Sequence, residues 1–237
     1  MMSDVAKKTV LAFDTAMGGI SVGVIAANGH VVSRQLETQR EQASLLIPVI
    51  QEVLLEAQIG FKDLDLITST MGPGSFTGLR IGLTTAKVLS QSLDIPLVGL
   101  NTLSVMARHY EGDKPLLIVL ETKRQDFYAQ YFDGSDKGRV ALSEPFSALA
   151  SEVIEARPCD DFEIGGDCLK RFQSEVSKDS KGLKILDNWM HPDAIIMAQM
   201  ALTQIEQGSI LDSIEPVYLR GADASMPKIP PRQLAQS

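Results

Sequence analysis

Cysteine, histidine and aromatic side chains are scarce in this chain of 237 residues. The two cysteines, Cys159 and Cys168, are too few for a disulfide scaffold and lack CxxC spacing. The three histidines, His30, His109 and His191, lie far apart without HxxxH or HExxH spacing, so we predict no metal site. Thiols that stay reduced, and a start without a long apolar segment, indicate a cytoplasmic protein.

Long hydrophobic runs and an excess of positive charge are also missing. No apolar run reaches the ~18 residues that a membrane span needs, so we expect no membrane partner. The formal net charge of −8 repels nucleic-acid phosphates, so direct binding of nucleic acid by this chain alone is not expected. A hydrophobic content of 44% is typical of a globular protein with a sizeable core.

The first half of the chain has the order β-β-β-α-β-α-β. Asn28-Gly29, the strongest signal for a two-residue hairpin, separates two runs with strand composition. One strand precedes this hairpin, and two helix–strand pairs follow it. The expected strands are 9–13, 20–27, 31–36, 65–69 and 96–100, and the expected helices are 45–55 and 77–93.

The second half repeats this order. Its expected strands are 116–120, 127–132, 139–142, 162–164, 183–186 and 215–220, and its expected helices are 148–156, 169–176 and 193–207. The repetition predicts an α/β fold of two duplicated ribonuclease-H-like lobes, the plan of the actin, Hsp70 and sugar-kinase superfamily (ASKHA). We place the lobes at 1–103 and 104–220, and leave open that helix 193–207 packs back on the first lobe. A mobile tail is expected at 221–237.

The most distinctive segment is GPGSFTGLRIG, residues 72–82. A strand enters this glycine-rich turn and a helix leaves it, and free N–H groups at such a turn can cradle a phosphate. The spacing fits neither the P-loop nor the Rossmann turn, so we expect only a vestigial phosphate turn. Its candidate ligand-binding residues are Gly72 and Gly74, with Asp14 and Thr15 from the end of the first strand. Taken alone, the Asp14-Thr15 pair favours a local turn-forming role.

The matching place in the second half is Glu121-Thr122-Lys123-Arg124. These residues suit a second phosphate clamp, and they suit a solvated strand end equally well. Ser75 lacks the G-x-S-x-G context of a nucleophile and suits a helix N-cap, as does Thr77. We predict no catalytic residue.

Two expected helices of the first half, 45–55 and 77–93, have more small or apolar residues than a single core-facing stripe needs. Gly78, Gly82 and Ala86 recur at every fourth position and let another helix approach closely. Helix 45–55 is apolar beyond a narrow stripe. Packing within the chain and contact with a partner both explain these faces. As a hypothesis, we assign the partner interface to Leu46, Ile50, Gly78, Gly82 and Ala86.

These segments resemble those of the TsaB (YeaZ) family, across almost the whole chain. The matching pieces are LAFDTA (11–16), the glycine segment (72–82), GLNTL (99–103) and EPVYLR (215–220). The glycine segment is shared with the larger TsaD paralogue, whose HxxxH metal site corresponds here to residues 40–44, REQAS. The family's second-lobe loop begins Asp-Ala-Arg, whereas this chain has Glu121-Thr122-Lys123, a departure that weakens the case for a phosphate clamp there.

The resemblance implies a non-catalytic scaffold in the formation of threonylcarbamoyladenosine on tRNA. A TsaD-like partner would hold the metal and transfer the threonylcarbamoyl group from threonylcarbamoyl-AMP, and a TsaE-like ATPase would join the pair. The first-lobe helices would form the docking surface, and tRNA would be met only through the complex. We expect no firmly bound cofactor, with ATP or ADP at a subunit junction left open. The alternatives are an ATP-dependent small-molecule kinase or glycoprotease-like hydrolase of the same fold, and a homodimeric binding module.

Overall fold

The computed structural model describes residues 8–38, 40–135, 139–176, 184–208 and 214–219. Its first five strands are β1 (Val10–Asp14), β2 (Gly19–Ile25), β3 (Val31–Glu37), β4 (Leu66–Gly72) and β5 (Leu97–Asn101). The others are β6 (Leu116–Glu121), β7 (Phe127–Phe132), β8 (Phe146–Ala148), β9 (Glu163–Gly166) and β10 (Lys184–Asn188). The helices are α1 (Gln42–Glu56), α2 (Phe76–Leu93), α3 (Thr102–Ala107), α4 (Ala150–Glu155), α5 (Leu169–Glu175) and α6 (Ala194–Glu206), with a short 3-10 turn, η2 (Phe61–Asp63).

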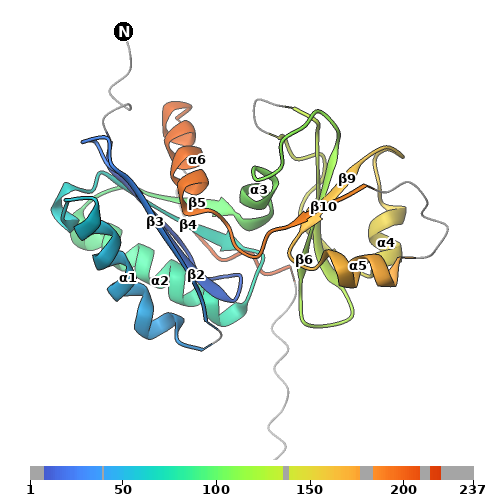
Figure 1. Cartoon of the computed structure of the whole chain (residues 1–237), viewed down its shortest axis with the longest axis horizontal. Coiled ribbons are helices and arrows are strands. Elements are labelled where there is room, and N and C mark those ends of the chain that lie inside the picture. The colour runs from blue at the N-terminus through green and yellow to red at the C-terminus, as the bar shows by residue number, and fades with distance from the viewer. Residues whose placement is uncertain (1–7, 39, 136–138, 177–183, 209–213, 220–237) are drawn as a thin grey trace, which may run out of the picture.

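The strands form two five-stranded sheets with the same order (Figure 1). The first sheet runs β3-β2-β1-β4-β5 and the second runs β8-β7-β6-β9-β10. In each sheet, the first three strands in sequence pair antiparallel, and the last two join parallel to them. The equivalence confirms the α/β fold of two ribonuclease-H-like lobes.

The first sheet is covered on both faces, so its central strand is buried along its whole length. Leu11 and Phe13 face the core under α1, and Ala86 of α2 joins the same cluster. Val10 and Ala12 point the opposite way, toward α6. Figure 1 shows α1 and α2 on one side of this sheet and α6 on the other. A helix that follows the last strand of the second lobe thus completes the core of the first.

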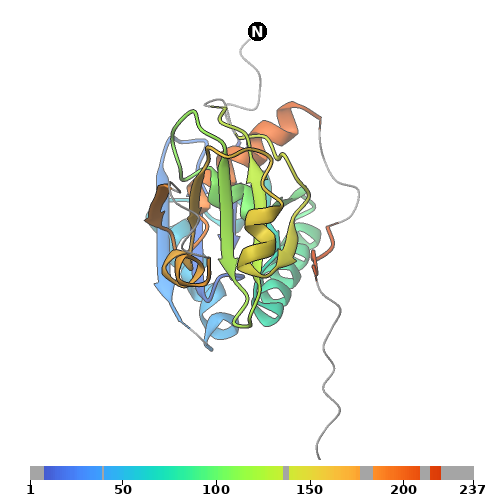
Figure 2. The same ribbon diagram turned by 90° about the vertical axis from the view of Figure 1, so that its right-hand side faces the viewer.

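The second sheet is covered in the same manner. Leu117 and Val119 pack with residues of α4 and α5, the helices that face the reader in Figure 2. Leu116 and Ile118 point the other way, toward α3, which follows the last strand of the first sheet. Each lobe therefore receives one covering helix from a segment where the chain passes between lobes.

The chain crosses between the lobes twice, after α3 and before α6. These two passages contact each other through stacked rings and hydrogen bonds. The His109 ring stacks on Trp189, with centroids 4.1 Å apart, and its Nε2 accepts a hydrogen bond from the Asp193 N–H at 3.2 Å. The Tyr110 hydroxyl donates to the Asp187 carbonyl oxygen at 2.7 Å. The Asp193 side chain also caps α6, as expected, by accepting from two backbone N–H groups.

Several sequence-based expectations need correction. Segment 215–220 was expected to be a strand, but residues 214–219 join neither sheet, and Arg220 lies outside the described residues. Segment 139–142 contributes only an isolated bridge, and the hairpin partner of β7 is β8, because the connection between the two strands is longer than expected. Helix α3 was not expected. The tail 221–237 lies outside the described residues. Within the described ranges, no helix combines the length and hydrophobicity of a membrane span.

Residues 214–219 form a strap across the ends of β4 and β5. The Val217 N–H donates to the Met71 carbonyl oxygen at 2.7 Å, and Ile214 is buried. Gly72 makes room for this crossing, because a Cβ there would lie 2.9 Å from the Val217 carbonyl oxygen. The φ of Gly72 is +109°, a conformation that favours glycine in any case.

Candidate functional site

A cleft of about 1520 Å³ lies between the two lobes. Its first-lobe wall includes Ala16 and Met17 from the turn after β1, and Gly74 and Ser75 from the glycine segment. Its second-lobe wall includes Glu121–Arg124 and the start of α5, and the strap forms part of its rim. The duplicated sheets place Asp14 and Glu121 at corresponding strand ends, as the repeated element order predicts.

Asp14 is buried beneath this cleft. One carboxylate oxygen accepts a hydrogen bond from the Thr70 hydroxyl, and the other accepts from the Ala16 N–H at 3.1 Å. Burial raises the pKa of the Asp14 carboxyl, and these hydrogen bonds oppose the rise only in part. Thr15 is equally buried, and its hydroxyl donates to the Gly78 carbonyl oxygen at 2.6 Å. Both side chains organise the turn after β1, the local role that the dipeptide favours.

The glycine segment packs directly against this turn. A Cβ on Gly78 would lie 2.0 Å from the Thr15 carbonyl oxygen, and one on Gly74 would lie 2.8 Å from the Ala16 Cβ. A Cβ on Gly82 would lie 2.8 Å from Thr15 Oγ1. The glycines therefore let the start of α2 pack directly against the backbone of the turn after β1.

Ser75 of the glycine turn takes part in the same contact. The Ser75 N–H donates to the Ala16 carbonyl oxygen at 2.8 Å. The Ser75 side chain caps α2 by accepting from the Gly78 N–H at 3.4 Å, the capping role expected from the sequence. Of the predicted phosphate set, Asp14, Thr15 and Gly74 thus meet around the turn after β1, whereas Gly72 lies under the strap.

The five residues assigned to the partner interface are buried inside the chain. Leu46 and Ile50 of α1 are at most 1% exposed. Gly78, Gly82 and Ala86 are also buried, the two glycines against the β1 turn and Ala86 in the core cluster with β1 and α1. The assignment of these five residues as an exposed docking surface is corrected, since each is covered by the same chain.

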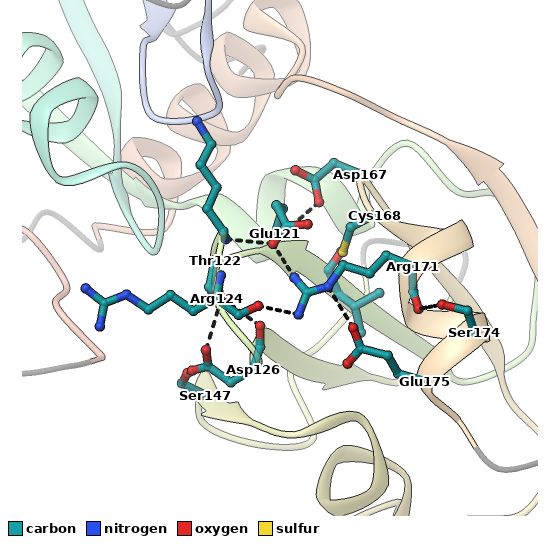
Figure 3. A network of polar contacts seen from close by, with 12 residues as sticks. Glu121, Thr122, Arg124, Asp126, Ser147, Asp167, Cys168, Arg171, Ser174 and Glu175 are labelled. Carbon is teal, nitrogen blue, oxygen red and sulfur yellow. Dashed lines mark hydrogen bonds and ion pairs between the residues drawn. The ribbon is translucent and has the colours of Figure 1, made fainter.

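The second-lobe wall is a network of ion pairs and hydrogen bonds (Figure 3). The Arg171 guanidinium forms an ion pair with Glu121 and a second one with Glu175, the latter at 2.8 Å. Its Cζ lies 4.1 Å from the centroid of the Phe127 ring. The Glu121 carboxylate is thus held by a cation of its own lobe, which supports the interpretation of this segment as a structured strand end.

Asp167, at the end of β9, contributes a buried carboxyl group to this wall. Its Oδ1 accepts a hydrogen bond from the Glu121 N–H at 2.8 Å. Burial raises the pKa of Asp167 to about 6, with a smaller contribution from the nearby Glu121 carboxylate. Burial and Asp167 also raise the pKa of the Cys168 thiol, so this cysteine is not an activated nucleophile.

Loop residues 122–126 complete the wall. The Thr122 hydroxyl donates to the Asp126 carbonyl oxygen at 2.6 Å, and the Ser147 hydroxyl donates to the Asp126 carboxylate. Sequence reasoning missed Asp167, Arg171 and the rim residue Tyr218. The Gly165-Gly166-Asp167 sequence at a predicted strand end was the signal for the first; the other two depend on tertiary packing.

Across the described residues, no group of three or more His, Cys, Asp or Glu side chains is placed to hold a metal ion. His191 lines the cleft, and its two ring nitrogens are buried without a hydrogen-bond partner among the described residues. Its ring fits against the bare backbone of Gly19, where a Cβ would lie 2.6 Å from His191 Cε1. This contact joins the second passage between the lobes to the first-lobe hairpin.

Comparison with known proteins assigns this architecture to a family. The family model TsaD, described as tRNA N6-adenosine threonylcarbamoyltransferase, matches residues 17–171, more than half of the chain. The chain belongs to this family. Within it, the named relatives place the chain with the TsaB (YeaZ) proteins.

TsaB of Buchnera aphidicola (Schizaphis graminum) is 35% identical over 55% of this chain, which spans 61% of that protein. TsaB of Escherichia coli K12 is 26% identical over 94% of this chain and 99% of that protein. The solved structure of YeaZ from Pseudomonas aeruginosa has a TM-score of 0.77 and 22% identity, and covers 90% of this chain and 100% of that chain. A second P. aeruginosa structure, described as similar to the peptidase YEAZ, has a TM-score of 0.79 at the same identity and coverage. At this identity, the structural likeness establishes the fold alone.

Proposed function

We propose that this chain is a non-catalytic scaffold subunit in the biosynthesis of tRNA threonylcarbamoyladenosine. The relatives named TsaB are described as tRNA threonylcarbamoyladenosine biosynthesis proteins, and the family model describes the transferase. In this proposal, a TsaD-type subunit transfers the threonylcarbamoyl group from threonylcarbamoyl-AMP to adenosine. The present chain supports that subunit and performs no transfer itself.

The observation that carries the scaffold role is the packing of the glycine segment. The sequence predicted a vestigial phosphate turn in this segment, next to Asp14 and Thr15 at the end of β1. Here Gly78 rests on the Thr15 backbone, and the Ser75 N–H is bonded to Ala16. The side chains in this joint hold the lobe together, because Asp14 accepts from the Ala16 N–H of its own turn and from the Thr70 hydroxyl of β4.

The outer faces of α1 and α2 supply the docking surface in this proposal. Large apolar side chains stay exposed there: Ile47 is 37% exposed, Leu55 is 79% exposed and Val88 is 54% exposed. The inner faces of the same helices are packed on the first sheet. Apolar side chains on neighbouring outer helix faces are typical of surfaces that bind another helix pair.

The remaining partners belong to the same proposal. A TsaE-like ATPase would join the pair, with ATP or ADP held at a subunit junction. The net charge of −8 suits a subunit that leaves contact with tRNA to its partners. The same helix faces would pair two copies of this chain when the TsaD-type subunit is absent.

The test is complex formation between this chain and a TsaD-type subunit, measured by calorimetric titration and by mass. The paired change Ile47→Asp and Val88→Asp places charges on the docking surface and should abolish binding while leaving the fold intact. Val31→Asp is the matched control, because Val31 is 57% exposed on β3 and points to the face opposite Val32, the residue that packs in the cluster with α1. Binding by the paired variant at wild-type strength would contradict the docking surface. Failure of the wild-type chain to bind would contradict the scaffold role.

The kinase and hydrolase alternatives are tested separately. Either one requires turnover by the isolated chain, such as magnesium-dependent ATP hydrolysis that Asp14→Ala removes. The scaffold proposal expects no such turnover. Activity that survives purification to homogeneity and depends on Asp14 would replace the scaffold with an enzyme.

A further inference from the structure

The strap, residues 214–219, runs beside α2 in the opposite direction. Glu215 forms an ion pair with Lys87 of α2, with Nζ and Oε1 3.3 Å apart. Further along the strap, Tyr218 reaches the first turns of α2, where its ring centroid lies 5.4 Å from that of Phe76. The strap therefore adds its own side chains to the outer face of α2.

Arg80 is held between the strap and the helix. Its Cζ lies 3.9 Å from the centroid of the Phe76 ring, and its Nε donates to the Tyr218 hydroxyl at 3.4 Å. Both rings remain partly open to solvent, Phe76 at 45% and Tyr218 at 44% exposure. No acceptor among the described residues bonds the two terminal nitrogens of Arg80, and the residue is exposed, so these donors are available to a partner.

This arrangement is a prepared receptor for an anionic group. A guanidinium presents a planar fork of N–H donors that matches a carboxylate in two parallel hydrogen bonds. Ring contacts restrict the rotamers of Arg80 before binding, which lowers the entropy lost when a partner is bound. The exposed rings of Phe76 and Tyr218 add apolar contact area beside the guanidinium. A protein segment can cover this area, whereas a free, hydrated phosphate cannot.

The receptor is continuous with the docking surface. Phe76, Arg80, Thr84 and Val88 are all exposed, and their spacing of four residues places them along one stripe of α2. A partner that covers Val88 would reach Arg80 two turns away along the same helix.

We propose that Phe76, Arg80 and Tyr218 form a receptor for a carboxylate side chain of the TsaD-type partner, and that the strap is needed to complete it. This inference rests on the proposed function. It assigns a binding role to the EPVYL residues of the strap, and it adds a charged contact to an interface that is otherwise apolar.

The experiment measures the affinity of the full-length chain for a TsaD-type subunit by titration calorimetry at low and high salt. Arg80→Glu reverses the charge and should weaken binding by about 100-fold or more. Arg80→Lys keeps the charge but loses the fork, so an intermediate loss is expected. Tyr218→Ala removes one wall and should weaken binding by about 10-fold. The wild-type affinity should fall with salt more steeply than that of Arg80→Glu.

Arg108→Glu is the matched control, because it makes the same charge change at an exposed arginine at the end of α3. It should bind as the wild type does, and circular dichroism should show all variants folded. Wild-type binding together with unchanged binding by a folded Arg80→Glu would overturn the receptor alone. If inorganic phosphate or ATP competes with the partner in wild type but not in Arg80→Lys, the site is a phosphate site and the carboxylate assignment is overturned. If the wild-type chain does not bind at all, the proposed function fails, and the receptor with it.

Discussion

The carbonyl oxygen of Thr15 lies 2.0 Å from the position that a Cβ atom on Gly78 would occupy. Side-chain atoms do not approach backbone so closely, so only glycine lets the start of α2 rest on the turn after β1. The Thr15 hydroxyl fastens the contact by donating to the Gly78 carbonyl oxygen at 2.6 Å. This joint links the central strand to α2 and lies next to Ala16 and Ser75 of the cleft wall.

The first prediction follows from this contact. Gly78→Ala should destabilise the protein by more than about 3 kcal/mol, because a methyl group there forces the helix and the turn apart. Urea unfolding measures the loss. Gly60→Ala is the control, since a Cβ there would meet only Asp63 Oδ2, at the ordinary distance of 3.7 Å. Equal losses for the two variants would show that the close approach does not govern the stability of the joint.

The sequence was sufficient to predict the elements around this joint but not what they contact. Asn28-Gly29 located the hairpin, and Ser75 was recognised as a cap for α2. The four-residue spacing of Gly78, Gly82 and Ala86 predicted close packing. That spacing is the same whether the neighbour is a strand end of the same chain or a partner, so the pattern could not show that Thr15 fills the space.

Arg139 carries the second prediction. Its guanidinium is buried and donates to backbone carbonyl oxygens of Tyr110 at 3.1 Å, Lys114 at 2.7 Å and Asp133 at 2.9 Å. It thereby ties the passage after α3 to the end of β7. Arg139→Lys keeps the charge but cannot reach several carbonyls at once, so we expect a loss of about 2–4 kcal/mol in unfolding free energy.

Arg157→Lys is the control for this change, because the hydrogen bonds of Arg157 to described residues are exposed ones, to its own helix end and to Asp160. Its effect on urea unfolding should stay within about 0.5 kcal/mol. A loss for Arg139→Lys no larger than that of the control would mean that the carbonyl contacts add nothing to the stability of the passage.

His109 predicts a dependence of stability on pH. Burial lowers the pKa of His109, and its Nε2 must stay unprotonated to accept from the Asp193 N–H. The unfolded chain therefore binds the proton more readily, and stability falls as the pH drops below the usual histidine value of about 6.5. His109→Asn should remove part of this fall when urea midpoints are compared at pH 7.5 and 5.5. His30→Asn, in the exposed turn between β2 and β3, should retain it.

The second lobe was harder to predict because its elements are short. Helix α3 has six residues and β8 has three, too few for a hydrophobic period to be recognised. Asn101 was the available signal for α3, since its side chain caps the helix by accepting from the Ser104 N–H. The strap has the composition of a strand, and only the tertiary structure shows that its Val217 N–H bonds to the end of β4.

Asp167 gives a pH dependence of the opposite sign. Burial raises the pKa of Asp167 from 3.8 to about 6, so its contribution to stability is complete below pH 3.8 and is lost as the pH rises through about 6. Asp167→Asn keeps an oxygen to accept from the Glu121 N–H and removes the buried charge. The variant should therefore be more stable than wild type at pH 8, by on the order of 1 kcal/mol, and the gain should disappear at pH 4. Asp160→Asn, at an exposed ion pair, should show no such pH-dependent gain. A gain for Asp167→Asn that is the same at both pH values would mean that the substitution acts through packing and not through the buried charge.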